Sequence, residues 1–180
     1  MQRRIAVLTI LVLTIAAVTT AVFAQEDKSN RPSPPAQALC KFDNGKTITV
    51  DYSSPRMKGR KIFGGLEAYG KVWRAGANEA TTFVTDGNLT VEGKAVPAGN
   101  YTIFAIPDPN KWTLIINKKT GEWGIPYTYE ADELVRVPMK TSKTPAPVEN
   151  FAIGFDQHDQ TCTLHLTWEN TDASVLIRGK

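Results

Sequence analysis

The side chains best suited to chemistry are concentrated in one short segment, residues 73–81. Within it, Arg74 supplies a forked cation, Asn78 an amide that both donates and accepts hydrogen bonds, and Glu79 a carboxyl group. A guanidinium group binds carboxylate or phosphate oxygens through paired hydrogen bonds, so this combination suits an anionic ligand. Two interpretations are open. The segment forms a binding or catalytic site, or Arg74 and Glu79 neutralise each other and hold a long loop on the fold.

If the segment is catalytic, we expect hydrolase-type chemistry, with Glu79 as general acid/base and with Arg74 and Asn78 positioning an anionic substrate. If it is a binding site, the candidate residues come from the segment itself and from the sequence on either side of it. These candidate ligand-binding residues are Tyr52, Arg60, Trp73, Arg74, Asn78, Glu79 and Trp123. The sequence favours a binding or structural module of the cell envelope over an enzyme, and leaves open whether the protein has an enzymatic activity.

Aromatic residues recur in the same irregular parts of the chain: Tyr69, Trp73, Trp123, Tyr127 and Tyr129. Such rings offer a broad apolar surface with a polar edge, which suits stacking against a sugar or another flat ligand. The alternative is that they close the open end of a β-sandwich. A small-molecule or a glycan ligand is therefore expected if the protein binds one.

A self-formed amide bond is a sharper hypothesis for the same segment. Lys61 or Lys71 could react with Asn78 beside Glu79, provided that the lysine is buried and its pKa is lowered.

No motif for a metal or cofactor is present. The two histidines, His158 and His165, show neither the HxH nor the HExxH spacing of zinc sites. The sequence contains no phosphate-binding loop, dinucleotide glycine motif or nucleophile elbow. We therefore expect no metal and no cofactor.

The first residues are typical of an export signal. Arg3 and Arg4 precede an apolar stretch, and Val22-Phe23-Ala24 offers small residues before Gln25. We expect a cleaved signal peptide over residues 1–24, a Pro-rich flexible lead-in over 25–38 and a single domain over 39–180; an uncleaved membrane anchor is the rival interpretation. The mature protein is then secreted or periplasmic, without stable membrane insertion.

The charge balance excludes one class of partner. The chain of 180 residues has a formal net charge of +3, and loss of Arg3 and Arg4 with residues 1–24, which contain no acid, lowers it to +1. A nearly neutral chain lacks the basic surface that a phosphate backbone requires, so we expect no nucleic-acid partner. The sequence does not specify an oligomeric state.

The periodicity from Leu39 onward predicts β-strands. Ile48, Val50 and Tyr52 alternate with polar residues, and Asn44-Gly45 before them is a strong hairpin turn. We expect an all-β fold with little helix, an antiparallel β-sandwich or jelly-roll of about nine or ten short strands. Besides the strand at 48–52, strands are expected at 79–85, 89–91, 100–106, 111–117, 133–139, 151–155, 161–168 and 174–178. Two irregular stretches, 53–78 and 118–131, are long enough to be functional loops.

The chain has two cysteines, Cys40 and Cys162. Export would place them where disulfides persist, so a Cys40–Cys162 disulfide is one interpretation. Two separate buried thiols are the other.

Three runs of the sequence, 51–83, 91–107 and 112–124, resemble the DUF2911 family of exported bacterial proteins. The resemblance is carried by blocks such as Tyr52-Ser-x-Pro55, Trp73-Arg-x-Gly-Ala-Asn-Glu-Ala-Thr81 and Pro97-Ala-Gly-x-Tyr101, and it extends over 39–177. It implies a secreted or periplasmic β-sandwich without an assigned biochemical activity.

Overall fold

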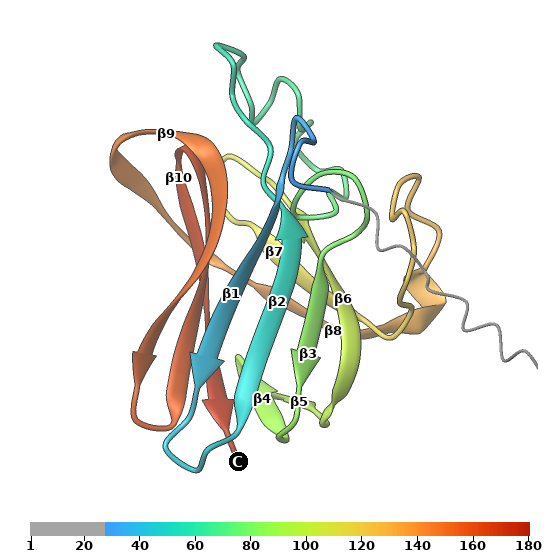
Figure 1. Ribbon diagram of the computed structural model, residues 1–180, viewed down its shortest axis with the longest axis vertical. Helices are drawn as coiled ribbons and strands as arrows, with labels where there is room; N and C mark the ends of the chain where they lie inside the picture. Colours follow the sequence, from blue (N-terminus) through green and yellow to red (C-terminus); the bar gives the residue numbers. More distant parts are fainter. Residues whose placement is uncertain (1–27) are drawn as a thin grey trace, which may run out of the picture.

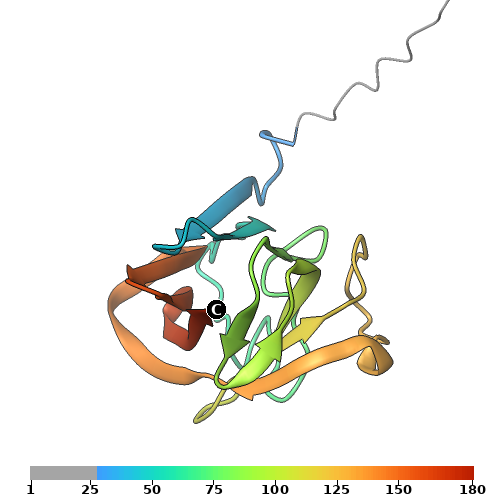
Figure 2. The ribbon, with the colours of Figure 1, turned by 90° about the horizontal axis from the view of Figure 1, so that it is seen from below.

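The computed structural model describes residues 28–180, so the predicted signal peptide lies outside the described residues. Two antiparallel sheets make up the fold, as the sequence predicts (Figures 1 and 2). The strands are β1 (Pro35–Lys41), β2 (Thr47–Ser53), β3 (Thr82–Thr85), β4 (Leu89–Val91), β5 (Lys94–Val96), β6 (Gly99–Ile106), β7 (Thr113–Asn117), β8 (Glu133–Pro138), β9 (Lys140–His158) and β10 (Thr161–Gly179), with one 3-10 turn, η1 (Glu130–Asp132). One sheet has the order β1-β2-β3-β6-β7-β8, and the other has the order β5-β4-β10-β9.

Alternating side chains build the core between the sheets. Ile48 and Val50 of β2 point inward and are fully buried, as are Cys162, Leu164 and Leu166 of β10. A pleated strand sends alternate residues to opposite faces, so each of these runs contributes one apolar face. The prediction of an all-β sandwich is confirmed. Among residues 28–180, no helix is both long and apolar enough to span a bilayer.

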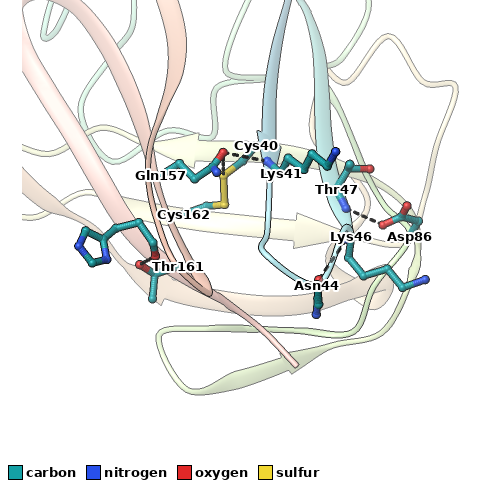
Figure 3. The surroundings of a disulfide bond; sticks show 10 residues. Cys40, Lys41, Asn44, Lys46, Thr47, Asp86, Gln157, Thr161 and Cys162 are labelled. Carbon is teal, nitrogen blue, oxygen red and sulfur yellow. Dashed lines mark hydrogen bonds between the residues drawn. A yellow bond between two sulfur atoms is a disulfide. The ribbon is translucent and has the colours of Figure 1, made fainter.

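A disulfide joins the two sheets. Cys40 of β1 is bonded to Cys162 of β10 across a sequence separation of 122 residues (Figure 3). Beside it, the backbone N–H of Lys41 donates to Oε1 of Gln157, at 3.2 Å. Of the two interpretations of the cysteines, the structure therefore supports the disulfide.

The first strand begins earlier than expected. Residues 35–38, which the sequence analysis assigns to the flexible lead-in, form the start of β1 and pair with β2. Proline is tolerated there because β1 is an edge strand whose first residue need not donate a hydrogen bond. The division into signal peptide, lead-in and domain stays a prediction.

The last two strands are longer than their sequence pattern indicates. Three separate strands are expected over 151–178, but β9 and β10 each have 19 residues and form one long hairpin. The pairing shifts register between Thr167 and Thr171, where Glu169 takes a positive φ of 54°. The first half of β9 is almost wholly exposed and contains Pro145 and Pro147, so it carries no apolar alternation that would reveal a strand.

The segment between β2 and β3, residues 54–81, covers one end of the sandwich, where the N-terminal segment also lies (Figure 1). The backbone of Met57 donates to the carbonyl of Glu149 in β9, and Trp73 forms an isolated bridge with Ala105 of β6. The carboxylate of Glu169 accepts from the backbone N–H groups of Ile62 and Phe63. These contacts hold the long segment in place, and the site described below depends on it.

Candidate functional site

The base of the covered end is a group of buried aromatic rings. Trp73 is only 3% exposed and stacks on Trp168 with ring centroids 5.9 Å apart. Its indole N–H donates to the carbonyl of Gly76 at 3.1 Å. Phe63 and Phe151 meet Trp73 edge-on. Trp73, a predicted ligand-binding residue, is therefore mainly part of the core, with one edge facing the cavity described next.

A cavity of about 380 Å³ opens beside Trp73. We call it the arginine cleft. Its walls include two cations, one carboxyl group and apolar surface: Arg60, Leu66, Glu67, Trp73, Arg74 and Ile125. Three predicted ligand-binding residues, Arg60, Trp73 and Arg74, therefore meet in one cavity. Its volume is within the range of small-molecule sites, about 300–1,000 Å³.

Arg74 is held by the other long loop. Its Nη1 donates to the carbonyl of Trp123 at 3.0 Å, and its guanidinium carbon lies 4.9 Å from the centre of the Trp123 ring. A cation over an indole face is attracted by the ring electrons. Burial lowers the pKa of Arg74, an effect that the carboxylates of Glu67 and Glu79 oppose. The structure thus brings two predicted residues, Arg74 and Trp123, into direct contact.

Arg60 stands at the rim of the cleft. Its Nε donates to the carbonyl of Met57 at 2.9 Å, and its Nη2 donates to the carbonyl of Arg56 at 2.7 Å. These two hydrogen bonds fix the guanidinium plane, and no other hydrogen bond from residues 28–180 engages its remaining N–H groups.

Glu67 is the functional candidate that the sequence analysis did not identify. Burial raises its pKa from 4.5 to about 7, although Arg74 and then Arg60 act to lower it. No hydrogen bond from residues 28–180 reaches its carboxyl group. A carboxyl group with a pKa near neutrality beside two arginines is the type of group found at functional sites. The one feature of the sequence that could have indicated Glu67 is its position as an acid between two apolar residues, Leu66 and Ala68, in a loop with arginines on both sides.

Glu79 lies outside the arginine cleft. Lys28 donates to its Oε1 at 2.8 Å, and Nη1 of Arg31 contacts both carboxylate oxygens at 3.0 Å. The pKa of Glu79 is lowered to about 2, chiefly by the hydrogen bond from Lys28. It therefore pairs with the N-terminal segment rather than with Arg74.

The remaining predicted residues accompany Glu79. The amide of Asn78 donates to the carbonyl of Ser33 at 3.0 Å, which fastens the N-terminal segment at a second point. Tyr52 is buried, packs edge-on against Phe151 and lines a separate cavity of about 200 Å³ together with Glu79. The predicted set thus divides into two groups, one at the arginine cleft and one under the N-terminal segment.

The residues of the amide-bond hypothesis do not have the surroundings that the reaction requires. Lys61 and Lys71 are both exposed, whereas the reaction needs a buried lysine. The Asn78 amide is engaged with a backbone carbonyl instead.

Most of the loop aromatics pack inward. Tyr127 and Tyr129 lie against Phe104, and the Tyr127 hydroxyl donates to Glu133 at 2.7 Å. By contrast, Tyr69 and Trp123 are 42% and 56% exposed. These two are the loop aromatics with an accessible face.

Both histidines lie beside aspartate side chains. His165 Nδ1 lies 3.0 Å from Asp172, and its Nε2 lies 3.3 Å from Asp156. Within residues 28–180, no group of three or more His, Cys, Asp and Glu side chains could hold a metal ion.

Comparison with known proteins yields one match. The family model described as "Protein of unknown function (DUF2911)" matches residues 33–177. No curated protein and no solved structure matches the chain significantly. The description of the family gives no activity and no site residue, so any functional argument depends on the geometry above.

Proposed function

Because this chain belongs to the DUF2911 family, a family of unknown function, we propose from its geometry that it is an exported β-sandwich module that binds a small anionic ligand in the arginine cleft. The single observation that carries this proposal is the presence of two guanidinium groups, Arg60 and Arg74, on a cavity with only one carboxyl group, Glu67.

The charge of the cleft suits an anion. Two arginines stay protonated at neutral pH, whereas Glu67, with a pKa of about 7, carries a full negative charge for only part of the time. The net charge of the cleft is therefore positive. Planar guanidinium groups bind carboxylate and phosphate oxygens through paired hydrogen bonds, so the ligand should carry one of these groups.

The rest of the cleft suits an apolar body attached to that group. Leu66, Val72, Ile125 and the edge of Trp73 line the same cavity. Small-molecule sites combine apolar surface with polar groups that fix the orientation of the ligand, and the cleft contains both. We therefore infer that the natural ligand is a small metabolite with one or two acidic groups.

A hydrolase remains the second candidate, with Glu67 replacing Glu79 as its general acid/base. Glu79 holds its proton too weakly, because its pKa is about 2 and its carboxylate is paired with Lys28 and Arg31. Proton transfer is most efficient when the pKa lies near the working pH, as it does for Glu67. Binding remains the primary proposal because the two guanidinium groups suit a bound anion whether or not Glu67 transfers a proton.

The proposed location is the periplasm or the exterior of the cell. The Cys40–Cys162 disulfide supports it, because such bonds persist in oxidising compartments. The predicted signal peptide over residues 1–24 gives independent sequence support.

Titration calorimetry with succinate and with inorganic phosphate tests the binding proposal. We expect either anion to bind, and Arg74→Gln and Arg60→Gln to weaken binding about tenfold each, since a charged hydrogen bond contributes roughly 1.5–3 kcal/mol. Arg178→Gln is the matched control, because Arg178 is exposed on β10 and away from the cleft. Unchanged affinity in both cleft variants would refute the proposal.

A further inference from the structure

A second cavity, of about 390 Å³, lies where the 54–81 segment meets the turn after β6 and the bend of the β9–β10 hairpin. It shares no lining residue with the arginine cleft. Its floor is aromatic, because the buried rings of Phe63 and Trp112 meet there edge-on with centroids 4.6 Å apart. Tyr69 forms an exposed wall, and we call the cavity the Tyr69 groove.

The Tyr69 ring is held in position although it is 42% exposed. It lies directly over Gly64, where a Cβ atom would come within 2.4 Å of the ring. The next residue, Gly70, donates its N–H to the carbonyl of Pro107 at 2.8 Å. A ring that is fixed before binding loses little conformational freedom when a ligand stacks on it, so it makes an efficient binding surface.

Polar side chains without partners surround this aromatic surface. Among residues 28–180, no hydrogen bond or ion pair engages the side chains of Ser142, Lys143, Asn170 or Thr171. Asp108 uses only Oδ1, which accepts from the backbone N–H groups of two neighbouring residues in its turn. The groove therefore offers free donors and acceptors on one side of an exposed ring.

The charge and the backbone of the groove narrow the choice of ligand. Asp108 and Lys143 are its only charged side chains, so the groove has no net charge and does not favour an anion. A peptide bound by strand addition needs unpaired backbone groups at a sheet edge. Here Lys143 and Thr171 are paired with each other in the β9–β10 ladder. The backbone groups between these two strands are therefore engaged at this point, and the free side chains named above are the binding groups of the groove.

We propose that the Tyr69 groove binds a neutral saccharide, with a sugar ring stacked on Tyr69 and its hydroxyl groups bound by Asn170, Lys143 and Asp108. A sugar has an apolar C–H face and a rim of hydroxyl groups that both donate and accept. These two properties match an aromatic surface bordered by an amide, an ammonium and a carboxylate group. The site is separate from the arginine cleft and does not depend on the proposed function.

The test uses the mature protein with three neutral probes, maltotriose, cellotriose and triacetylchitotriose. Saturation-transfer NMR and titration calorimetry detect binding at up to about 10 mM saccharide. We expect at least one probe to bind. Tyr69→Ala should weaken that binding about tenfold or more, whereas Tyr69→Phe, which keeps the ring, should leave it within about threefold of the natural protein.

Two further variants test whether the saccharide binds in the Tyr69 groove. Asn170→Ala removes a free amide on an exposed side chain, so it should fold normally and weaken binding if the hydroxyl contacts exist. Trp123→Ala removes another exposed ring, outside the groove, and should leave saccharide binding unchanged. The proposal is overturned if none of the three saccharides binds, or if Tyr69→Ala and Asn170→Ala both bind as the natural protein does.

Discussion

Arg74 and Trp123, 49 residues apart in sequence, are joined by two interactions: a hydrogen bond from the guanidinium group to the Trp123 carbonyl at 3.0 Å, and a contact of that group with the indole ring at 4.9 Å. Arg74 belongs to the segment between β2 and β3, and Trp123 to the loop between β7 and η1. The two irregular segments that the sequence singles out are therefore connected at the arginine cleft. Trp123 covers the cation that we propose binds the ligand.

The contact predicts that Trp123→Ala weakens anion binding without unfolding the protein. The exposed indole contributes little to the core, but its loss removes the ring contact that helps to position Arg74, while the hydrogen bond to the backbone carbonyl of residue 123 remains. A cation–π contact at an exposed site contributes roughly 0.5–1 kcal/mol, so affinity for succinate should fall about two- to fivefold. Calorimetry measures the affinity, and the thermal midpoint should stay within about 2 °C of that of the natural protein. Unaltered affinity would show that the ring does not position Arg74.

From the raised pKa of Glu67 we expect the stability of the natural protein, relative to Glu67→Gln, to depend on pH. Its pKa is raised from 4.5 to about 7 in the folded protein, so the folded state binds the proton more tightly than the unfolded state. The free energy of unfolding therefore decreases as the pH rises from 4.5 to about 7, and the loss is complete above that range. Glu67→Gln removes this loss and should be more stable than the natural protein at pH 8 by about 1–3 kcal/mol.

Urea unfolding at pH 4 and at pH 8 measures the difference in free energy of unfolding between Glu67→Gln and the natural protein. The advantage of Glu67→Gln should nearly disappear at pH 4, where the carboxyl group is mostly protonated in both states. Glu130→Gln is the matched control, because Glu130 is exposed in η1, away from the cleft. If Glu67→Gln were stabilised equally at both pH values, the cause would be a change in packing and not the titration of Glu67.

The sequence predicts the fold better than the site. The strands follow from local patterns in the sequence, whereas the site depends on contacts between residues that are far apart in sequence. The alternation in β2 is a local pattern, and Ile48 and Val50, which it sets on one face of the strand, are buried in the core. The first half of β9 has no such pattern, since pairing with β10 rather than burial holds it in the sheet.

The site was predicted only in part because neighbours in sequence diverge in space. Four residues separate Arg74 from Glu79, and two of them, Ala75 and Asn78, take positive φ angles of 49° and 58°. The chain turns sharply there, so the two side chains enter different cavities. The actual partners of Glu79 are Lys28 and Arg31, about 50 residues away, and no local pattern reveals such a contact.

The disulfide predicts a large loss of stability on reduction. Cys40 and Cys162 close a loop across a separation of 122 residues, for which the chain-entropy model gives about 5 kcal/mol as an upper value. The Cys40→Ser/Cys162→Ser protein should unfold at a lower guanidinium concentration than the natural protein. Dithiothreitol should lower the midpoint of the natural protein and leave that of the double variant unchanged. A midpoint that neither change affects would contradict the prediction.

Glu79 predicts a structural role for the N-terminal segment that is independent of anion binding. Glu79→Gln removes the carboxylate charge that Lys28 and Arg31 bind, so residues 28–33 should exchange their amide hydrogens faster. Succinate affinity should not change, because Glu79 does not line the arginine cleft and Ser33, which does, keeps its hydrogen bond from Asn78. Hydrogen exchange followed by mass spectrometry measures the first effect, and calorimetry measures the second. If Glu79→Gln also lost succinate binding, Glu79 would have to be part of the ligand site.

The closeness of Glu67 to the two arginines predicts that anion affinity increases as the pH falls through about 7. Protonation of Glu67 removes the one negative charge that faces the ligand, while Arg60 and Arg74 stay charged. Sulfate is the appropriate probe, because it keeps its charge over this range and any change in affinity then belongs to the protein. We expect affinity to be about tenfold higher at pH 6 than at pH 8, since one charge at close range in a partly buried site contributes at least 1.4 kcal/mol. In Glu67→Gln the affinity should be high at both pH values. If the pH dependence persists in that variant, a different group controls the charge of the cleft, and the ligand does not sense Glu67.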